Sequence, residues 1–344
     1  MSRRTLTLLI ASIGTAAAIA VSVLIPVPYV ILGPGPTLNT LGKDSSGQQL
    51  ISIDGHATYP TSGHLNMVTV SYAGGPGSNI NIFSAIAAWL NPSEAVVPET
   101  ELFPAGTTQQ QAQQQDTAQM ASSQQLATAA AFTELGIKFT TLVTVTQTES
   151  GAPAASALKD GDVITAVDGQ AVTGDTQLTS LIRSHPAGSL LDMKVVRNGQ
   201  TEHVPVKTID SGGHPIIGVL VTDQYKFPFN VKISIGDIGG PSAGMMFALG
   251  IIDKLTTDNL TGGKFIAGTG EIEVGGKVDA IGGIQQKMIG ARNAGATVFL
   301  APASNCNDVK NAIPAGLRVV KVSTLSQAVT YLEDIKAGQP VPSC

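Results

Sequence analysis

The sequence contains few charged residues and very little cysteine, and both shortages exclude classes of function. Asp, Glu, Lys and Arg make up 13% of the 344 residues, and the formal net charge is −5. This composition offers no basic face for a nucleic acid, so we predict no nucleic-acid partner. Cys306 and Cys344 are the only cysteines, too few for a metal-binding framework, so we predict no metal site. Whether these two cysteines pair in an oxidising exterior stays open at the level of sequence.

A phosphate-binding loop is also missing. The pattern Gly-x-x-x-x-Gly-Lys-Ser/Thr, which cradles nucleotide phosphates, occurs nowhere in the sequence. Gly263-Lys264 and Gly276-Lys277 lack both the upstream glycine and the following hydroxyl residue. We therefore predict activity without ATP and without any other cofactor.

The residues near the N-terminus form a long apolar segment without charge. No Asp, Glu, Lys or Arg occurs between Arg4 and Lys43, and residues 5–32 are mostly apolar, enough for one transmembrane helix of about twenty residues. Basic residues before this segment favour a cytoplasmic tail at 1–4 and an extracytoplasmic body. A cleaved signal peptide is the alternative, since Ala16–Ala20 supplies small residues typical of a cleavage site. We predict a single-pass anchor in the cell membrane.

A serine and a lysine stand in two glycine-rich motifs. Ser242 lies in Gly-Gly-Pro-Ser-Ala-Gly at 239–244, just before an apolar run typical of a buried helix. Pro241 suits the first turn of that helix, whose free N–H groups could stabilise an oxyanion. Lys287 lies on the flank of an apolar stripe in a helix predicted at 284–294, where desolvation would lower its pKa. Taken singly, the serine could merely cap a helix and the lysine could lie along a solvated surface.

The order of motifs between residues 236 and 302 resembles the proteolytic domain of Lon-type serine proteases. The matching motifs are Gly-Gly-Pro-Ser-Ala-Gly at 239–244, Thr269-Gly270-Glu271, Gly275-Gly276-Lys277-Val278 and Ile281-Gly282-Gly283 ahead of Lys287. The resemblance implies that Ser242 is the nucleophile, that Lys287 is the general base and that Thr269 orients the lysine. Gly240 and Pro241 then support the serine turn, and a homo-oligomer is expected because Lon domains often form rings. Gly239 departs from the Asp of many cytosolic Lon proteases, and we assign no catalytic role to the nearest acid, Asp237.

Residues 136–210 resemble a PDZ domain. The resemblance is carried by Ser-Ala-Leu-Lys-Asp-Gly-Asp-Val-Ile-Thr-Ala-Val-Asp-Gly at 156–169, by a helix predicted at 175–185 and by a hairpin turn at Asn198-Gly199. It implies that an extended substrate tail adds to a sheet edge. A structural spacer is the alternative, and no glycine-rich carboxylate loop is recognisable at 142–148.

We therefore predict an α+β multidomain protein. Its expected parts are a tail at 1–4, an anchor at 5–32, a β-rich segment at 33–98, a Gln- and Ala-rich linker and helix at 99–135, a PDZ domain at 136–210, a Lon-type proteolytic domain at 211–338 and a tail at 339–344. The expected function is hydrolysis of peptide bonds in proteins or peptides by a membrane-anchored, extracytoplasmic serine endopeptidase with a Ser-Lys dyad. The alternatives are a non-proteolytic PDZ scaffold that retains the Lon fold and a processing factor that cuts only itself.

Overall fold

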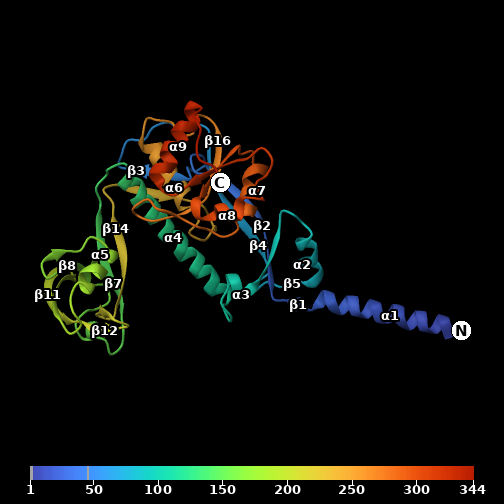
Figure 1. Ribbon diagram of the computed structural model, residues 1–344, viewed down its shortest axis with the longest axis horizontal. Coiled ribbons are helices and arrows are strands. Elements are labelled where there is room, and N and C mark those ends of the chain that lie inside the picture. The colour runs from blue at the N-terminus through green and yellow to red at the C-terminus, as the bar shows by residue number, and fades with distance from the viewer. Residues whose placement is uncertain (1–2, 45) are drawn as a thin grey trace. The chain divides into compact units, whose positions relative to one another are not determined.

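A computed structural model describes residues 3–44 and 46–344, with the backbone alone at 17–24 (Figure 1). The chain divides into two compact units. Unit 1 combines the residues up to Gly136 with Phe229–Cys344, and unit 2 is Ile137–Pro228. The division differs from the predicted boundaries, because the segment before the PDZ-like region and the segment after it fold together.

The N-terminal part of the chain changes from helix to strand within the predicted anchor. Helix α1 spans Arg3–Leu24, and it is followed by strands β1 (Pro26–Val27) and β2 (Tyr29–Asn39). The segment predicted as an anchor at 5–32 is therefore helix only as far as Leu24 and strand beyond it, where Pro26 and Pro28 lack the N–H that a continued helix needs. Over the described ranges, none of the helices combines the length and the apolar character that a membrane crossing requires.

Unit 1 is built on a six-stranded sheet with the order β20-β19-β16-β4-β2-β6. The other strands of this sheet are β4 (His64–Ala73), β6 (Ala95–Pro98), β16 (Phe265–Gly268), β19 (Val298–Pro302) and β20 (Arg318–Val322). Strand β16 runs parallel to β4 and β19, whereas β2 runs antiparallel to β4 and β6. The predicted separate β-rich segment at 33–98 is thus corrected, because its buried strand β4 completes the sheet of the C-terminal region.

Four longer helices accompany this sheet, namely α4 (Gln109–Glu134), α6 (Gly244–Leu255), α7 (Ile284–Asn293) and α9 (Leu325–Ala337). Helix α6 is buried along its whole length, as its apolar sequence predicts. The glutamine-rich run forms the first two turns of α4, so of the two readings of this run, a solvated helix or a flexible linker, the structure has the helix. Helix α4 starts with a capping box between Thr108 and Gln111 and contacts α6.

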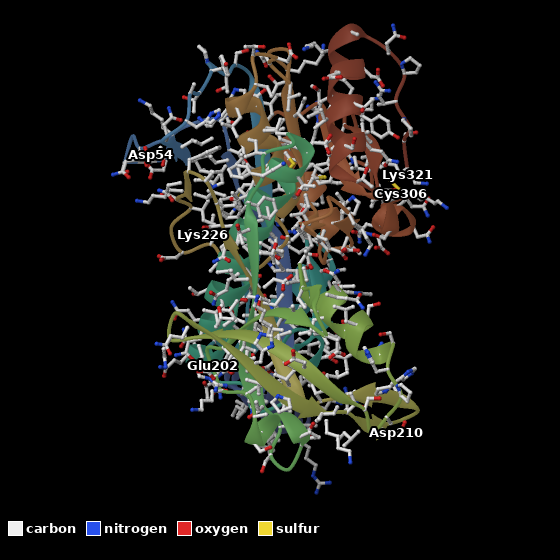
Figure 2. The ribbon with its side chains drawn as sticks, turned by 90° about the vertical axis from the view of Figure 1, so that its left-hand side faces the viewer. Asp54, Glu202, Asp210, Lys226, Cys306 and Lys321 are labelled. Carbon is white, nitrogen blue, oxygen red and sulfur yellow. A yellow bond between two sulfur atoms is a disulfide. The ribbon has the colours of Figure 1, made fainter. Side chains whose placement is uncertain are left out.

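The remaining elements of unit 1 are short. Strand β1 pairs with β5 (Ile80–Asn81), β3 (Ile51–Asp54) with β15 (Asn230–Ile233), and β17 (Glu271–Ile272) with β18 (Val278–Asp279). The short helices are α2 (Ile82–Trp89), α3 (Glu99–Leu102), α8 (Cys306–Val309) and the 3₁₀ turn Ala303–Asn305. A disulfide joins Cys306 to Cys344, which answers the open question about pairing and ties the predicted tail at 339–344 to α8 (Figure 2).

Unit 2 contains a sheet with the order β11-β10-β8-β7-β14, and β9 pairs with β8. Its elements are β7 (Thr140–Thr148), a 3₁₀ turn (Pro153–Ser156), β8 (Val163–Val167), β9 (Gln170–Ala171), α5 (Asp175–Arg183), β10 (Leu190–Arg197), β11 (Gln200–Lys207), β12 (Ile209–Ser211), β13 (His214–Ile216) and β14 (Val219–Lys226). The predicted end at residue 210 is wrong, since β14 pairs with β7 along its whole length. The buried carboxylate of Asp162 accepts hydrogen bonds from Arg197 at 2.6 and 2.8 Å.

Candidate active site

Ser242 lies in the turn that precedes the buried helix α6. The helix begins at Gly244, so Pro241 stands ahead of its first turn and not within it as predicted. Helix α4 holds this turn from the side. The hydroxyl of Ser123 donates to the carbonyl of Pro241 at 2.9 Å, and the N–H of Gly240 donates to the carbonyl of Asp116 at 3.2 Å. The Gly240-Pro241 turn is thus held by α4, and no sequence pattern predicts contact between this helix and the turn.

The side chains of Ser242, Lys287 and Thr269 meet in one hydrogen-bonded group. The Nζ of Lys287 lies 2.7 Å from the Oγ of Ser242 and 3.2 Å from the Oγ1 of Thr269. The hydroxyl of Thr269 also donates to the carbonyl of Ser242 at 2.9 Å. Thr269 follows β16 and Lys287 lies in the first turns of α7, so three separate elements place the group. The residues that the sequence selects from separate motifs are therefore brought together.

The surroundings of Lys287 favour the neutral amine. The residue is only 3% exposed, and burial lowers the pKa of Lys287 to about 8. The nearby charge of Glu271 opposes this shift, because a negative charge favours the ammonium form. Burial and the charge of Asp279 in turn raise the pKa of Glu271. An amine with a pKa of about 8 can accept a proton from a serine hydroxyl near neutral pH.

Comparison with known protein families identifies two domains in this chain. Residues 231–334 match the Lon protease C-terminal proteolytic domain, and residues 119–208 match the PDZ domain. The chain contains a Lon-type proteolytic domain and a PDZ domain. The Lon-type match lies in unit 1 and includes Ser242, Thr269 and Lys287.

Curated relatives match the Lon-type region only. The Lon protease of Neorickettsia sennetsu is 36% identical over 106 residues, which are 30% of this chain and 12% of that protein. Lon protease 2 of Herpetosiphon aurantiacus is 38% identical over 109 residues, which are 30% of this chain and 13% of that protein. Lon protease 1 of Bacillus subtilis is 28% identical over 120 residues, or 33% of this chain and 15% of that protein. The chain thus spans only a small fraction of the length of these relatives.

Among solved structures, the PDZ domain of the SdrC-like protein of Listeria monocytogenes is 28% identical. The alignment covers 23% of this chain and 85% of that domain, with a TM-score of 0.22.

Two backbone N–H groups in the Lon-type domain are free beside the serine. The first N–H groups of α6 are used, since Gly244 donates to Pro241 and Met245 donates to Gly270. In the part of the chain that the structure describes, the N–H groups of Ser242 and Ala243 donate no hydrogen bond. The N–H groups left free beside the serine are therefore those of the turn itself and not the first ones of α6.

A cleft of about 510 Å³ contains Ser242 and Lys287. Apolar side chains from β2, β4, α3 and α4 contribute much of its wall, including Leu32, Met67, Val70, Leu102 and Met120. A second cavity of about 750 Å³ continues along α4 and the loop before the serine. Both cavities are lined by Tyr72, Asp116, Met120 and the segment 237–239. The combined groove can take an extended polypeptide past the serine.

Asp116 is a cleft residue that the sequence analysis missed. Burial raises the pKa of its carboxyl group, which lines both cavities. Its close approach explains Gly239, since a Cβ at residue 239 would lie 2.5 Å from the side-chain Cβ of Asp116. Any side chain at this position would push α4 away from the serine turn. Asp237, the acid noted from the sequence, is exposed at the rim of both cavities and contacts neither Ser242 nor Lys287 by a hydrogen bond.

The PDZ domain carries a groove of its own. A cavity of about 470 Å³ lies between α5 and the segment from β13 into β14, and its apolar lining includes Leu178, Ile182, Ile217 and Val219. Strand β14 forms one edge of the sheet. The end of β13 and the two residues after it, 215–218, line this groove, whereas of the segment 142–148 only Gln147 does. The residues Pro215-Ile216-Ile217-Gly218 are only a weak sequence signal for a groove, and they follow the other PDZ motifs in the sequence.

Proposed function

We propose that this chain is a serine endopeptidase in which Ser242 is the nucleophile and Lys287 the general base. The observation that carries the proposal is the 2.7 Å contact between a buried lysine and a serine in an apolar cleft. Burial without an ion-pair partner favours the neutral form of a lysine, which is the form that can accept a proton. Within the described residues the side chain of Lys287 forms no ion pair, and its hydrogen-bond partners are two hydroxyl groups.

The reaction follows from this geometry. The neutral amine of Lys287 takes the proton of Ser242 as its Oγ bonds to the carbonyl carbon of the substrate. The N–H groups of Ser242 and Ala243 donate to the oxyanion that forms. The ammonium of Lys287 then protonates the leaving amine as the peptide bond breaks, and the acyl group stays on Ser242. Lys287 next accepts a proton from water as the water oxygen attacks the ester carbonyl. The ammonium then gives this proton to the Oγ of Ser242 as the ester bond breaks, which releases the acid product and restores the neutral amine. The hydroxyl of Thr269 holds the amine in line.

We propose that the PDZ domain binds substrate tails as extended peptides. The support is the groove beside the edge strand β14, whose backbone groups can pair with an added strand. The Lon-type cleft then cuts the bound polypeptide. A homo-oligomer is proposed from family resemblance alone.

We further propose that the protein is anchored in the cell membrane with its body outside the cytoplasm, and that it needs no nucleotide. The charge-free sequence at 5–32 and the absence of a phosphate-binding loop support these points. The Cys306–Cys344 disulfide also supports an oxidising exterior. Protease added outside intact spheroplasts should degrade the body, and added apyrase or chelator should leave the peptidase rate unchanged. Protection of the body, or loss of the rate, would contradict the respective point.

The dyad is tested by labelling and by substitution. A serine-directed acylating probe should label the protein at Ser242, and Ser242→Ala should remove the label. Ser242→Ala and Lys287→Met should each lower kcat/KM by on the order of 10³-fold or more, with a double variant no worse than either. Circular dichroism checks that each variant folds. Full peptidase activity in Ser242→Ala would exclude the proposed function, and a folded wild-type protein without labelling would favour a non-proteolytic scaffold.

A further inference from the structure

Helix α2 turns its small side chains inward and its large apolar side chains outward. Ala85 and Ala88 are buried, while Phe83, Ile86 and Trp89 are 45, 48 and 75% exposed. Leu90, directly after the helix, is 71% exposed. A surface helix of a water-soluble domain has the opposite pattern, with its large apolar residues facing the core. The exposed set therefore marks a surface that another apolar phase covers.

The sequence around this surface identifies that phase as lipid. No Asp, Glu, Lys or Arg occurs between Asp54 and Glu94. A protein-binding patch usually has a polar rim, whereas a bilayer surface favours apolar side chains with aromatic residues at the interface. Asn81 caps the start of α2, and Asn91 follows its end. These amides flank the apolar residues with polar groups of the kind that tolerate the headgroup layer.

The fold brings the start of α2 next to the end of the apolar N-terminal helix α1. Helix α1 ends at Leu24, and the next strand pairs Pro26 with Asn81, the residue before α2. The described part of α1 exposes further apolar side chains, among them Leu8 and Ile10. Most of the exposed large hydrophobic residues that the structure describes belong to these two helices and the residues beside them. The two apolar surfaces are thus joined by a short hydrogen-bonded connection.

We propose that α2 lies on the surface of a lipid bilayer, with Phe83, Ile86, Trp89 and Leu90 inserted at the boundary between headgroups and acyl chains. Because the surface is uncharged, this contact depends on apolar burial and needs no anionic lipid. Helix α2 packs on β2 and β6, and β2 supplies Leu32 to the cleft wall. Contact with the bilayer would therefore fix the orientation of the Lon-type domain. The proposal is separate from the peptidase function and holds whether or not α1 crosses the membrane.

Trp89 is the only tryptophan in the chain and reports on this helix directly. The full chain is reconstituted into phosphatidylcholine vesicles that carry bromine atoms at different depths of the acyl chains. We expect bromines near the headgroups to quench Trp89 more strongly than bromines at the bilayer centre. Vesicles should also protect Trp89 several-fold from acrylamide in the aqueous phase. Adding anionic lipid or salt should change neither result.

Substitutions separate insertion from mere closeness to the membrane. The double variant Ile86→Ser, Leu90→Ser keeps the tryptophan and should abolish most of the quenching of Trp89 by lipid bromines. The milder single variant Leu90→Ser should reduce this quenching in part. Leu190→Ser is the matched control, since Leu190 is 69% exposed on unit 2 and should leave the quenching unchanged. Circular dichroism and peptide cleavage show that the variants fold.

Two results would overturn the proposal. One is equal quenching of Trp89 by acrylamide with and without vesicles. The other is shielding that appears without lipid as protein concentration rises, which would assign the surface to a second copy of the chain. Neither result bears on the labelling of Ser242, so failure of this proposal and failure of the proposed function are distinguishable.

Discussion

At the scale of single residues, the proposed chemistry depends on how Lys287 is kept neutral. Burial does most of this, and the charge of Glu271 limits it. With a pKa of about 8, about one amine in ten is neutral at pH 7, whereas fewer than about one in a thousand would be neutral at the ordinary pKa of a lysine. The site gains a usable base because the amine is held among hydroxyl groups rather than beside a salt-bridge partner.

The pH dependence of the reaction tests this directly. Since the deprotonated amine is the active form, kcat/KM should rise about tenfold per pH unit below about 8 and level off above it. Removing the opposing charge with Glu271→Gln should move the rise to lower pH. Lys287→Arg should be inactive at every pH, because guanidinium keeps its proton. A maximum in the acid range, or an active arginine variant, would exclude Lys287 as the base.

At the scale of secondary-structure elements, α4 determines the position of the serine turn. It reaches Pro241 through Ser123 and Gly240 through the backbone of Asp116. Residues more than a hundred positions apart in sequence therefore share one short contact surface. The PDZ groove is equally a product of packing, since α5 and β14 face each other only after β14 joins the sheet edge.

A methyl group at residue 239 tests the role of α4. In Gly239→Ala the added Cβ would lie 2.5 Å from the Cβ of Asp116, so the helix or the turn must shift. We expect a lower Tm and a loss of about 100-fold in kcat/KM, since misplacement of reacting groups by about 1 Å has that effect. Gly275→Ala is the control, because its Cβ would meet no atom within 4 Å. Equal kinetics for both variants would show that α4 does not position the serine.

A bulky side chain in the PDZ groove tests substrate capture. Thr179 is exposed on α5 and lines the groove, so Thr179→Trp should obstruct an added peptide strand. Cleavage of a protein substrate with a flexible tail should show a higher KM, and the loss should exceed that for a short peptide. Thr176→Trp, on the same helix but outside this cavity, provides the comparison. An unchanged KM for the tailed substrate would leave the domain as a spacer.

At the scale of the whole molecule, the two units have separate cores, and the sheet of unit 1 combines strands from both ends of the chain. The chain end is fixed by the disulfide to α8, and Asn305 beside it hydrogen-bonds to both backbone groups of Ile281, close to the start of α7. The C-terminus thus supports the region that carries Lys287.

Reduction of the disulfide should therefore weaken unit 1 selectively. The bond closes a loop of 38 residues, and removal of such a cross-link costs about 4 kcal/mol in unfolding free energy by the chain-entropy estimate. Calorimetry with reductant should show a lower Tm for unit 1 and an unchanged transition for unit 2. The double variant Cys306→Ser, Cys344→Ser should melt like the reduced protein and be insensitive to reductant. A transition of unit 1 that ignores reductant would contradict this expectation.

The sequence by itself determined which side chains form the candidate site. Ser242, Thr269 and Lys287 stand in local motifs, and the proposed roles of nucleophile, base and orienting hydroxyl each need a particular side chain. The buried helix α6 and the PDZ motif at 156–169 could also be predicted from the sequence, because periodicity and turn residues act over a few positions.

Only the tertiary structure decided which distant segments complete these local pieces. It joined β4 to β16, brought Asp116 and Ser123 of α4 against the serine turn and placed residues 215–218 along the PDZ groove. A strand pattern specifies which side chains are buried but not which strand lies beside it, and a polar helix gives no sign of what its few small residues contact. Those choices depend on the packing of the whole chain, where each added contact has to offset the entropy of ordering two remote segments.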